Sequence, residues 1–65
     1  MNYLVRVIVR DGTAMWLGTP NDEDLRPLGE RERADVFDTR KKAQQAIARA
    51  KKTAPQSYQY EIVSA

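Results

Sequence analysis

Few residues in this chain could perform catalysis or bind a metal. The 65-residue sequence contains no histidine and no cysteine, so it lacks the most common general base, the most common soft metal ligand and the thiol nucleophile. Its densest acidic cluster is Asp22, Glu23 and Asp24, and this run lacks the alternating ligands and central glycine of a calcium-binding loop. We therefore expect no enzymatic activity, no metal site and no cofactor.

Positive charge is concentrated in residues 39 to 54, which contain six bases and no acid. These candidate binding residues, the basic surface, are Arg40, Lys41, Lys42, Arg49, Lys51 and Lys52. On one hypothesis they contact the phosphates of a nucleic acid, and binding would then weaken with salt. On the other they only solvate the outer side of a helix. No exposed aromatic set for base stacking accompanies them, because Tyr58 and Tyr60 fall on the expected core face of a strand.

A helix over residues 38 to 54 would position these bases. Its apolar residues recur at the spacing of a helix that packs on one side. This stripe consists of Ala43, Ala46, Ile47, Ala50 and Ala54. Because four of the five side chains are single methyl groups, the helix axis can lie close to the surface that it covers, which we expect to be a β-sheet. Asp38 or Thr39 can cap the first turn, and Pro55 cannot continue the helix.

The expected sheet begins with residues 2 to 10, which alternate as in a strand with one buried face. The core face carries Tyr3, Val5, Val7 and Val9. Asp11-Gly12 is a preferred pair for a two-residue type I′ turn, and such a turn places Val7 opposite Trp16. This register predicts that Trp16 joins the core, while its neighbours Met15 and Leu17 lie on the far face. A one-residue shift would exchange these faces.

The far face of the sheet is a second candidate binding surface. If one helix covers only the core face, apolar side chains stay partly exposed among charged ones, and a patch of that kind often marks a protein interface. The predicted interface residues are Leu4, Arg6, Ile8, Met15, Leu17 and Val63. The alternative is ordinary cross-strand packing, including an ion pair between Arg6 and Glu61 if their strands are neighbours. Formation of a homodimer through this face is a further alternative.

The remaining segments complete one α+β domain over residues 1 to 65. A short turn and an irregular loop are expected after the second strand, with Leu25 and Leu28 directed to the core. Residues 34 to 37 can add a short extended piece before the helix, and residues 57 to 64 alternate as a closing strand. The predicted order is β-β-α-β, with an antiparallel sheet of three or four strands and one helix packed on one face.

The distribution of charge is more informative than the net charge of +2. The acids of residues 22 to 38 could be presented to a basic groove, or they could be neutralised locally by Arg26, Arg31 and Arg33 or by the basic helix. No apolar run reaches the roughly 20 residues that span a bilayer. The chain has no cysteine, so nothing in it points to an oxidising compartment. We therefore expect a soluble cytoplasmic protein without membrane contact.

Several short motifs together resemble a known class of protein. They are Trp16-Leu17-Gly18, then Ala34, Phe37 and Thr39 before an alanine-rich helix with Ala43, Ala46 and Ile47, and the closing Tyr60-Glu61-Ile62-Val63. In this pattern the chain resembles the short accessory proteins encoded by tailed phages and prophages. The resemblance implies a protein that binds a host protein or a defence complex in the cytoplasm of a bacterial host, as the anti-CRISPR inhibitors do.

Two functional hypotheses follow. The leading one is a non-enzymatic interaction module that occludes a surface of a host protein. The alternative is a nucleic-acid-binding domain that uses the basic helix over residues 39 to 54. The first depends on the far face of the sheet, and the second depends on the six bases.

Overall fold

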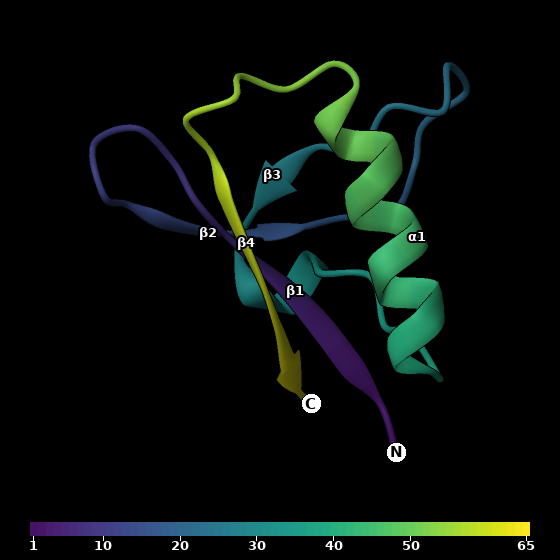
Figure 1. Ribbon diagram of the computed structural model, residues 1–65. Coiled ribbons are helices and arrows are strands. Elements are labelled where there is room, and N and C mark those ends of the chain that lie inside the picture. The colour runs from purple at the N-terminus through teal and green to yellow at the C-terminus, as the bar shows by residue number, and fades with distance from the viewer.

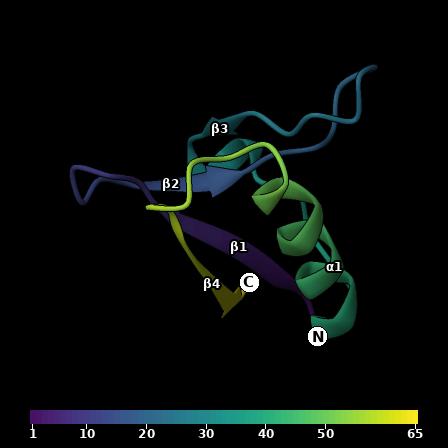
Figure 2. The ribbon, with the colours of Figure 1, turned by 45° about the horizontal axis from the view of Figure 1, so that its top comes forward.

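A computed structural model describes residues 1–65 and contains a four-stranded sheet, one α-helix and one short 3-10 helix (Figure 1). The elements are β1 (Tyr3–Ile8), β2 (Ala14–Leu17), β3 (Leu28–Gly29), η1 (Arg31–Arg33), α1 (Arg40–Lys51) and β4 (Gln59–Ser64). The strand order is β3-β2-β1-β4, and every neighbouring pair is antiparallel. Figure 2 shows the strands in this order with α1 to one side. The predicted α+β class is confirmed, and β3 supplies the fourth strand.

The core lies between the sheet and α1, which packs against β1 and β4. Its buried members are Val5, Val7, Leu17, Phe37, Ala43 and Ala46. The predicted core faces of β1, α1 and β4 are confirmed, since Tyr3, Val9, Ile47, Ala50, Tyr58, Tyr60 and Ile62 are partly buried against this cluster. Because methyl side chains face the sheet, the helix can approach it closely. The hydrophobic contact area supplied by α1 is correspondingly small.

The first turn of α1 is capped by Thr39, whose Oγ1 accepts a hydrogen bond from the Lys42 amide at 3.1 Å. This bond satisfies one of the amides that a helix start leaves unpaired. The Lys42 ammonium pairs with Asp38 at 3.1 Å, which offsets its unfavourable position near the positive end of the helix dipole. The helix ends at Lys51, a few residues before the predicted limit, because residues 52–54 form a turn.

The β1–β2 hairpin has a three-residue loop, Arg10 to Gly12, and the predicted two-residue turn is wrong. The Val9 amide donates to the Thr13 carbonyl at 3.0 Å, and the Gly12 amide donates to the Val9 carbonyl at 2.9 Å. Gly12 has a φ of +89°, the left-handed conformation that closes such a loop after a type I turn. Asp11 reinforces it by accepting a bond from the Thr13 amide at 2.9 Å, and its hydrogen bonds with Thr13 lower the pKa of the Asp11 carboxyl.

The extra loop residue changes the face on which every β2 side chain lies. Arg6 is paired with Trp16, and Val7 is paired with Met15, so Trp16 lies on the far face of the sheet. Leu17 is instead in the core, with 1% of its surface exposed. The predicted core position of Trp16 is therefore wrong, as is the predicted far-face position of Met15 and Leu17. Side chains alternate along a strand, so a shift of one residue reverses all three assignments.

The segment between β2 and α1 is held by Arg26. Its Nη1 donates to the Gly18 carbonyl at 3.0 Å and to Asp35 Oδ2 at 2.7 Å, and its guanidinium lies 5.2 Å from the centre of the Phe37 ring. The extended residues 34–37 bridge to the sheet at both ends, Ala34 to Gly18 and Phe37 to Tyr3. The predicted extended piece is thus present, and Arg26 connects it to the end of β2 through its bonds to Asp35 and Gly18.

The loop before β3 is closed by Asn21, whose Oδ1 accepts bonds from the amides of Glu23 at 2.9 Å and Leu25 at 3.1 Å. Leu28 packs against the core, as predicted. Leu25 is 41% exposed, so its predicted core position is wrong. The Asn21 amide also donates to the Leu25 carbonyl at 2.8 Å, and the Asp24 amide donates to the Asn21 carbonyl at 3.0 Å. These bonds make a tight turn, and the Leu25 side chain lies towards solvent.

Candidate functional site

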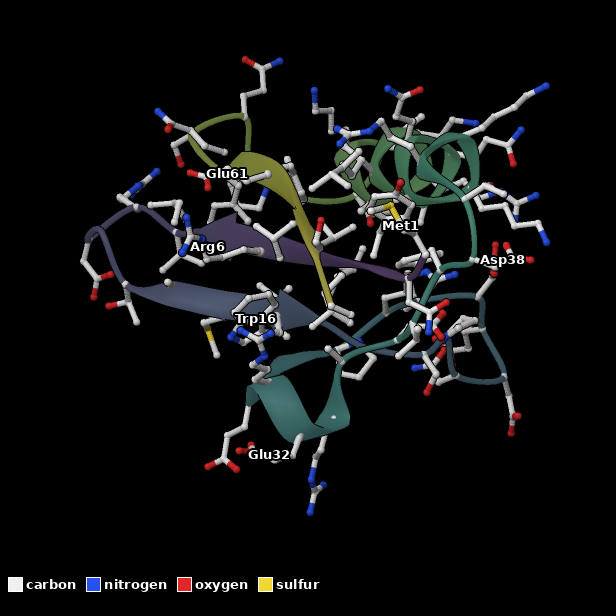
Figure 3. All side chains as sticks on the ribbon, turned by 90° about the horizontal axis from the view of Figure 1, so that it is seen from below. Met1, Arg6, Trp16, Glu32, Asp38 and Glu61 are labelled. Atoms are coloured by element: carbon white, nitrogen blue, oxygen red, sulfur yellow. The ribbon has the colours of Figure 1, made fainter.

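A row of three side chains crosses the sheet on the face opposite α1. Glu61 on β4 is paired with Arg6 on β1, and Arg6 is paired with Trp16 on β2, as Figure 3 shows. Arg6 and Glu61 form a partly exposed ion pair, with 39% and 46% of their side-chain surfaces exposed. The ion pair that the cross-strand packing alternative expected for neighbouring strands is therefore present. It places adjacent positive and negative charges in the middle of the face.

Trp16 ends this row beside a position that has no side chain. Its partner on β3 is Gly29, and a Cβ at Gly29 would meet no atom within 4 Å. The Arg31 guanidinium lies 5.0 Å from the centre of the Trp16 ring, an arrangement that favours a cation–π interaction. The indole is half-buried, so it is held in place by the sheet and Arg31 but stays accessible from solvent.

Apolar residues flank the row on the same face. Leu4 is paired with Val63, and alternation along β1 brings Ile8 to this side as well. Leu4 is buried, whereas Ile8 and Val63 are half-buried. We call the open face the set Leu4, Arg6, Ile8, Trp16, Glu61 and Val63. Four of the six predicted interface residues belong to it, and Met15 and Leu17 do not.

Sequence reasoning missed Trp16 and its neighbour Arg31. Their position depends on hairpin loop length, and Asp11-Gly12 fits a two-residue loop as well as a three-residue loop that ends in glycine. The available signal was the amphipathic indole itself, because a tryptophan with both an apolar body and a polar N–H is often found at protein interfaces.

The basic surface of α1 is largely engaged within the chain. Arg40 lies over the Tyr3 ring at 5.3 Å, and Lys51 lies over the Tyr60 ring at 5.7 Å. Lys42 pairs with Asp38 as described above, and Arg49 approaches Asp24 to 3.4 Å. Among the six bases, only the side chains of Lys41 and Lys52 make no ion pair, hydrogen bond or cation–π contact. Four of the six bases therefore have a partner within the chain, and all six lie at exposed positions.

Three ion pairs involve acids of the segment over residues 22–38, one each at Asp24, Asp35 and Asp38. Asp24 faces Arg49 across the gap to the helix, and Asp35 is paired with Arg26. The second pair is partly buried, with 19% and 25% of the side-chain surfaces exposed. Three of the seven acids in this segment thus have a basic partner within the chain, as the local-neutralisation alternative expects, and the other four make no ion pair.

A groove of about 480 Å³ lies between the end of α1 and the loop that follows β2. Its apolar lining includes Leu17, Leu28, Ala50, Tyr58 and Tyr60, with Arg49 and Lys52 among its charged residues. Burial and the neighbouring Tyr58 raise the pKa of Tyr60 above its ordinary value. The volume is in the range of small-molecule sites, but two charged residues of the lining, Asp24 and Arg49, are paired with each other.

No group of three or more acidic side chains is placed to hold a metal ion, and α1 is neither long nor apolar enough to cross a membrane. No protein-family model, curated protein or solved structure matches this chain.

Proposed function

We propose that this chain is a small interaction module without catalytic activity that binds a protein partner through the open face of its sheet. The observation that supports this proposal is the row of Trp16, Arg6 and Glu61 on a face that α1 does not cover. The resemblance to phage accessory proteins suggests that the partner is a host protein or a defence complex, whose surface the module would occlude.

The composition of the open face suits a protein partner. Tryptophan and arginine are the residues that most often dominate the binding energy of protein interfaces, especially where neighbouring contacts exclude water. Here the Trp16 indole is oriented before binding by Arg31, so little side-chain entropy would be lost on association. The adjacent Arg6 and Glu61 present both signs of charge, which favours a protein surface over a uniformly negative nucleic acid.

The alternative function, nucleic-acid binding by α1, has less support because four of its six bases are engaged within the chain. It makes a distinct prediction. Replacing Lys41 and Lys52 together by glutamate would weaken oligonucleotide binding, and the affinity of the wild-type protein would fall steeply with salt. Fluorescence anisotropy with labelled oligonucleotides over a salt series measures both effects.

The open-face proposal is tested by capture from a bacterial host lysate, followed by titration of the purified partner. Trp16 is the only tryptophan, so its fluorescence reports directly on contact at this face. We expect Trp16→Ala to weaken binding by at least about 2 kcal/mol, or roughly 30-fold. The Lys41→Glu, Lys52→Glu double variant is the control and should bind like the wild type.

A second variant separates binding from folding. Exchanging the charges of Arg6 and Glu61 keeps an ion pair on the sheet but reverses the pattern that a partner meets. We expect this swap to preserve the thermal unfolding midpoint and to reduce partner affinity. If both Trp16→Ala and the charge swap bound the partner normally, the open face would not be the binding surface.

A further inference from the structure

The two edges of the sheet are protected to different extents. β3 has only two residues and follows Pro27 directly. β4 is six residues long, contains no proline, glycine or lysine, and has β1 as its only neighbour. Its register with β1 is continuous, without a bulge. Natural sheets usually shield long edge strands with such devices, because a bare edge pairs readily with another strand.

The hydrogen bonds show which backbone groups of β4 face outward. The Ala65 amide donates to the Asn2 carbonyl at 2.9 Å, while Tyr3 exchanges both of its backbone bonds with Phe37 on the other side of β1. Bonded and non-bonded pairs alternate along an antiparallel ladder. The residues of β4 that bond to β1 are therefore Val63, Glu61 and Gln59. The N–H and C=O groups of Tyr60, Ile62 and Ser64 point to the free edge.

We infer that β4 pairs antiparallel with β4 of a second copy of this chain, with Ile62 on the twofold axis. This inference concerns the edge of the sheet and is independent of the proposed function of its open face. In this register Ile62 faces Ile62 of the second copy, and Tyr60 faces Ser64 of the second copy. All outward backbone groups of the strand are then hydrogen-bonded, because each of these is a bonded pair.

Self-complementarity favours a second copy as the occupant. The register with Ile62 on the axis sets Glu61 opposite Val63 of the second copy. Moving the axis to Glu61 would place Glu61 opposite Glu61 of the second copy, and like charges directly opposite are unfavourable. Moving the axis to Val63 would pair only residues 62–64 of the strand. In this register the half-buried Ile62 side chain also packs against the Ile62 side chain of the second copy.

The size of the core gives a second reason. Only seven apolar side chains are buried, and two of them are alanines. Domains of this size often gain stability from oligomerisation. A twofold axis perpendicular to the sheet would join two four-stranded sheets into one, with both open faces on the same side and both α1 helices on the other.

Amide hydrogen exchange tests the inference on the wild-type protein. Sedimentation equilibrium should show a concentration-dependent dimer, measured in roughly 0.3 M salt to screen repulsion between the two basic helices. Over the same concentrations the amides of Ile62 and Ser64 should become protected. The Glu61 and Val63 amides serve as controls, because they are protected in the monomer. A protein that stayed monomeric up to about 1 mM would overturn the inference, as would a dimer in which Ile62 exchanged as in the monomer.

Position 63 tests the register. Val63→Lys and Val63→Glu remove the same apolar side chain, but in the inferred dimer they place opposite charges against Glu61 of the second copy, at two symmetry-related contacts. We expect Val63→Lys to dimerise more tightly than Val63→Glu by about tenfold. Equal dimer affinities would show that β4 does not pair in this register. A host protein that bound β4 through an extended segment, while this chain stayed monomeric, would also show that a second copy is the wrong partner for this edge.

Discussion

Cationic side chains lie over aromatic rings at four places in this protein. Arg26, Arg31, Arg40 and Lys51 each lie between 5.0 and 5.7 Å from a ring centre. Such contacts bury the aliphatic stems of long side chains on apolar surface while the charge stays near water. In a domain with few large buried side chains, Arg26, Arg40 and Lys51 cover rings that belong to the core or pack against it. Arg31 instead covers Trp16 on the open face. Four of the eleven bases therefore have a structural use.

Arg26 is the base whose loss should cost the most stability. Its replacement by alanine removes two hydrogen bonds and leaves the partly buried Asp35 carboxylate without a partner. We expect Arg26→Ala to lower the free energy of unfolding by about 1–3 kcal/mol, measured by urea denaturation. Arg33→Ala is the matched control, because Arg33 is exposed and makes no side-chain hydrogen bond or ion pair. Equal effects of the two variants would contradict the role assigned to Arg26.

The hairpin between β1 and β2 is the element on which the open face depends. A loop of three residues closed by Gly12 sets the register, and the register brings Trp16 to the same side as Arg6. Two-residue and three-residue loops use the same dipeptide but give opposite faces to β2. The composition of the open face is thus decided by one turn.

Two glycine substitutions test this element. Gly12 has a φ of +89° and Gly29 does not have a positive φ, so alanine is strained only at the first position. We expect Gly12→Ala to destabilise the protein by about 1–2 kcal/mol. Gly29→Ala should be neutral or stabilise it by up to about 1 kcal/mol, since a methyl group meets open space there. Thermal unfolding measures both, and an equal loss from the two variants would argue against a strained turn.

At the scale of the whole molecule, one helix lies close to one face of a four-stranded sheet. Ala43 and Ala46 have 0% and 4% of their surfaces exposed, and they line the contact between α1 and the core. The close approach leaves no room for larger residues. Because the protein has only one α-helix, the opposite face of the sheet has no covering helix. The proposed function uses this uncovered face.

Enlarging the alanine contact should force the two layers apart. We expect Ala43→Leu to cost about 1–3 kcal/mol of folding free energy because the helix must move away from the sheet. Ala48→Leu is the control on the exposed side of the same helix and should change stability by less than about 0.5 kcal/mol. Chemical denaturation compares them. Tolerance of leucine at position 43 would mean that the layers are less tightly packed than the burial of Ala43 indicates.

Sequence periodicity by itself determined β1, α1, β4 and the faces that they bury. Alternation in residues 2–10 and 57–64 and the alanine stripe of the helix are local patterns, and each depends only on the geometry of its own element. The sequence left the cap open between Asp38 and Thr39, and it predicted the pairing of Arg6 with Glu61 only if their strands are neighbours. Tertiary structure decided the rest. The face on which Trp16 lies depends on the length of the hairpin loop. Strand β3 is defined only by its pairing with β2. The ion-pair partners of Arg26 and Arg49 lie in other segments of the chain. Such features are set by contacts between elements, which the periodicity of one segment does not encode.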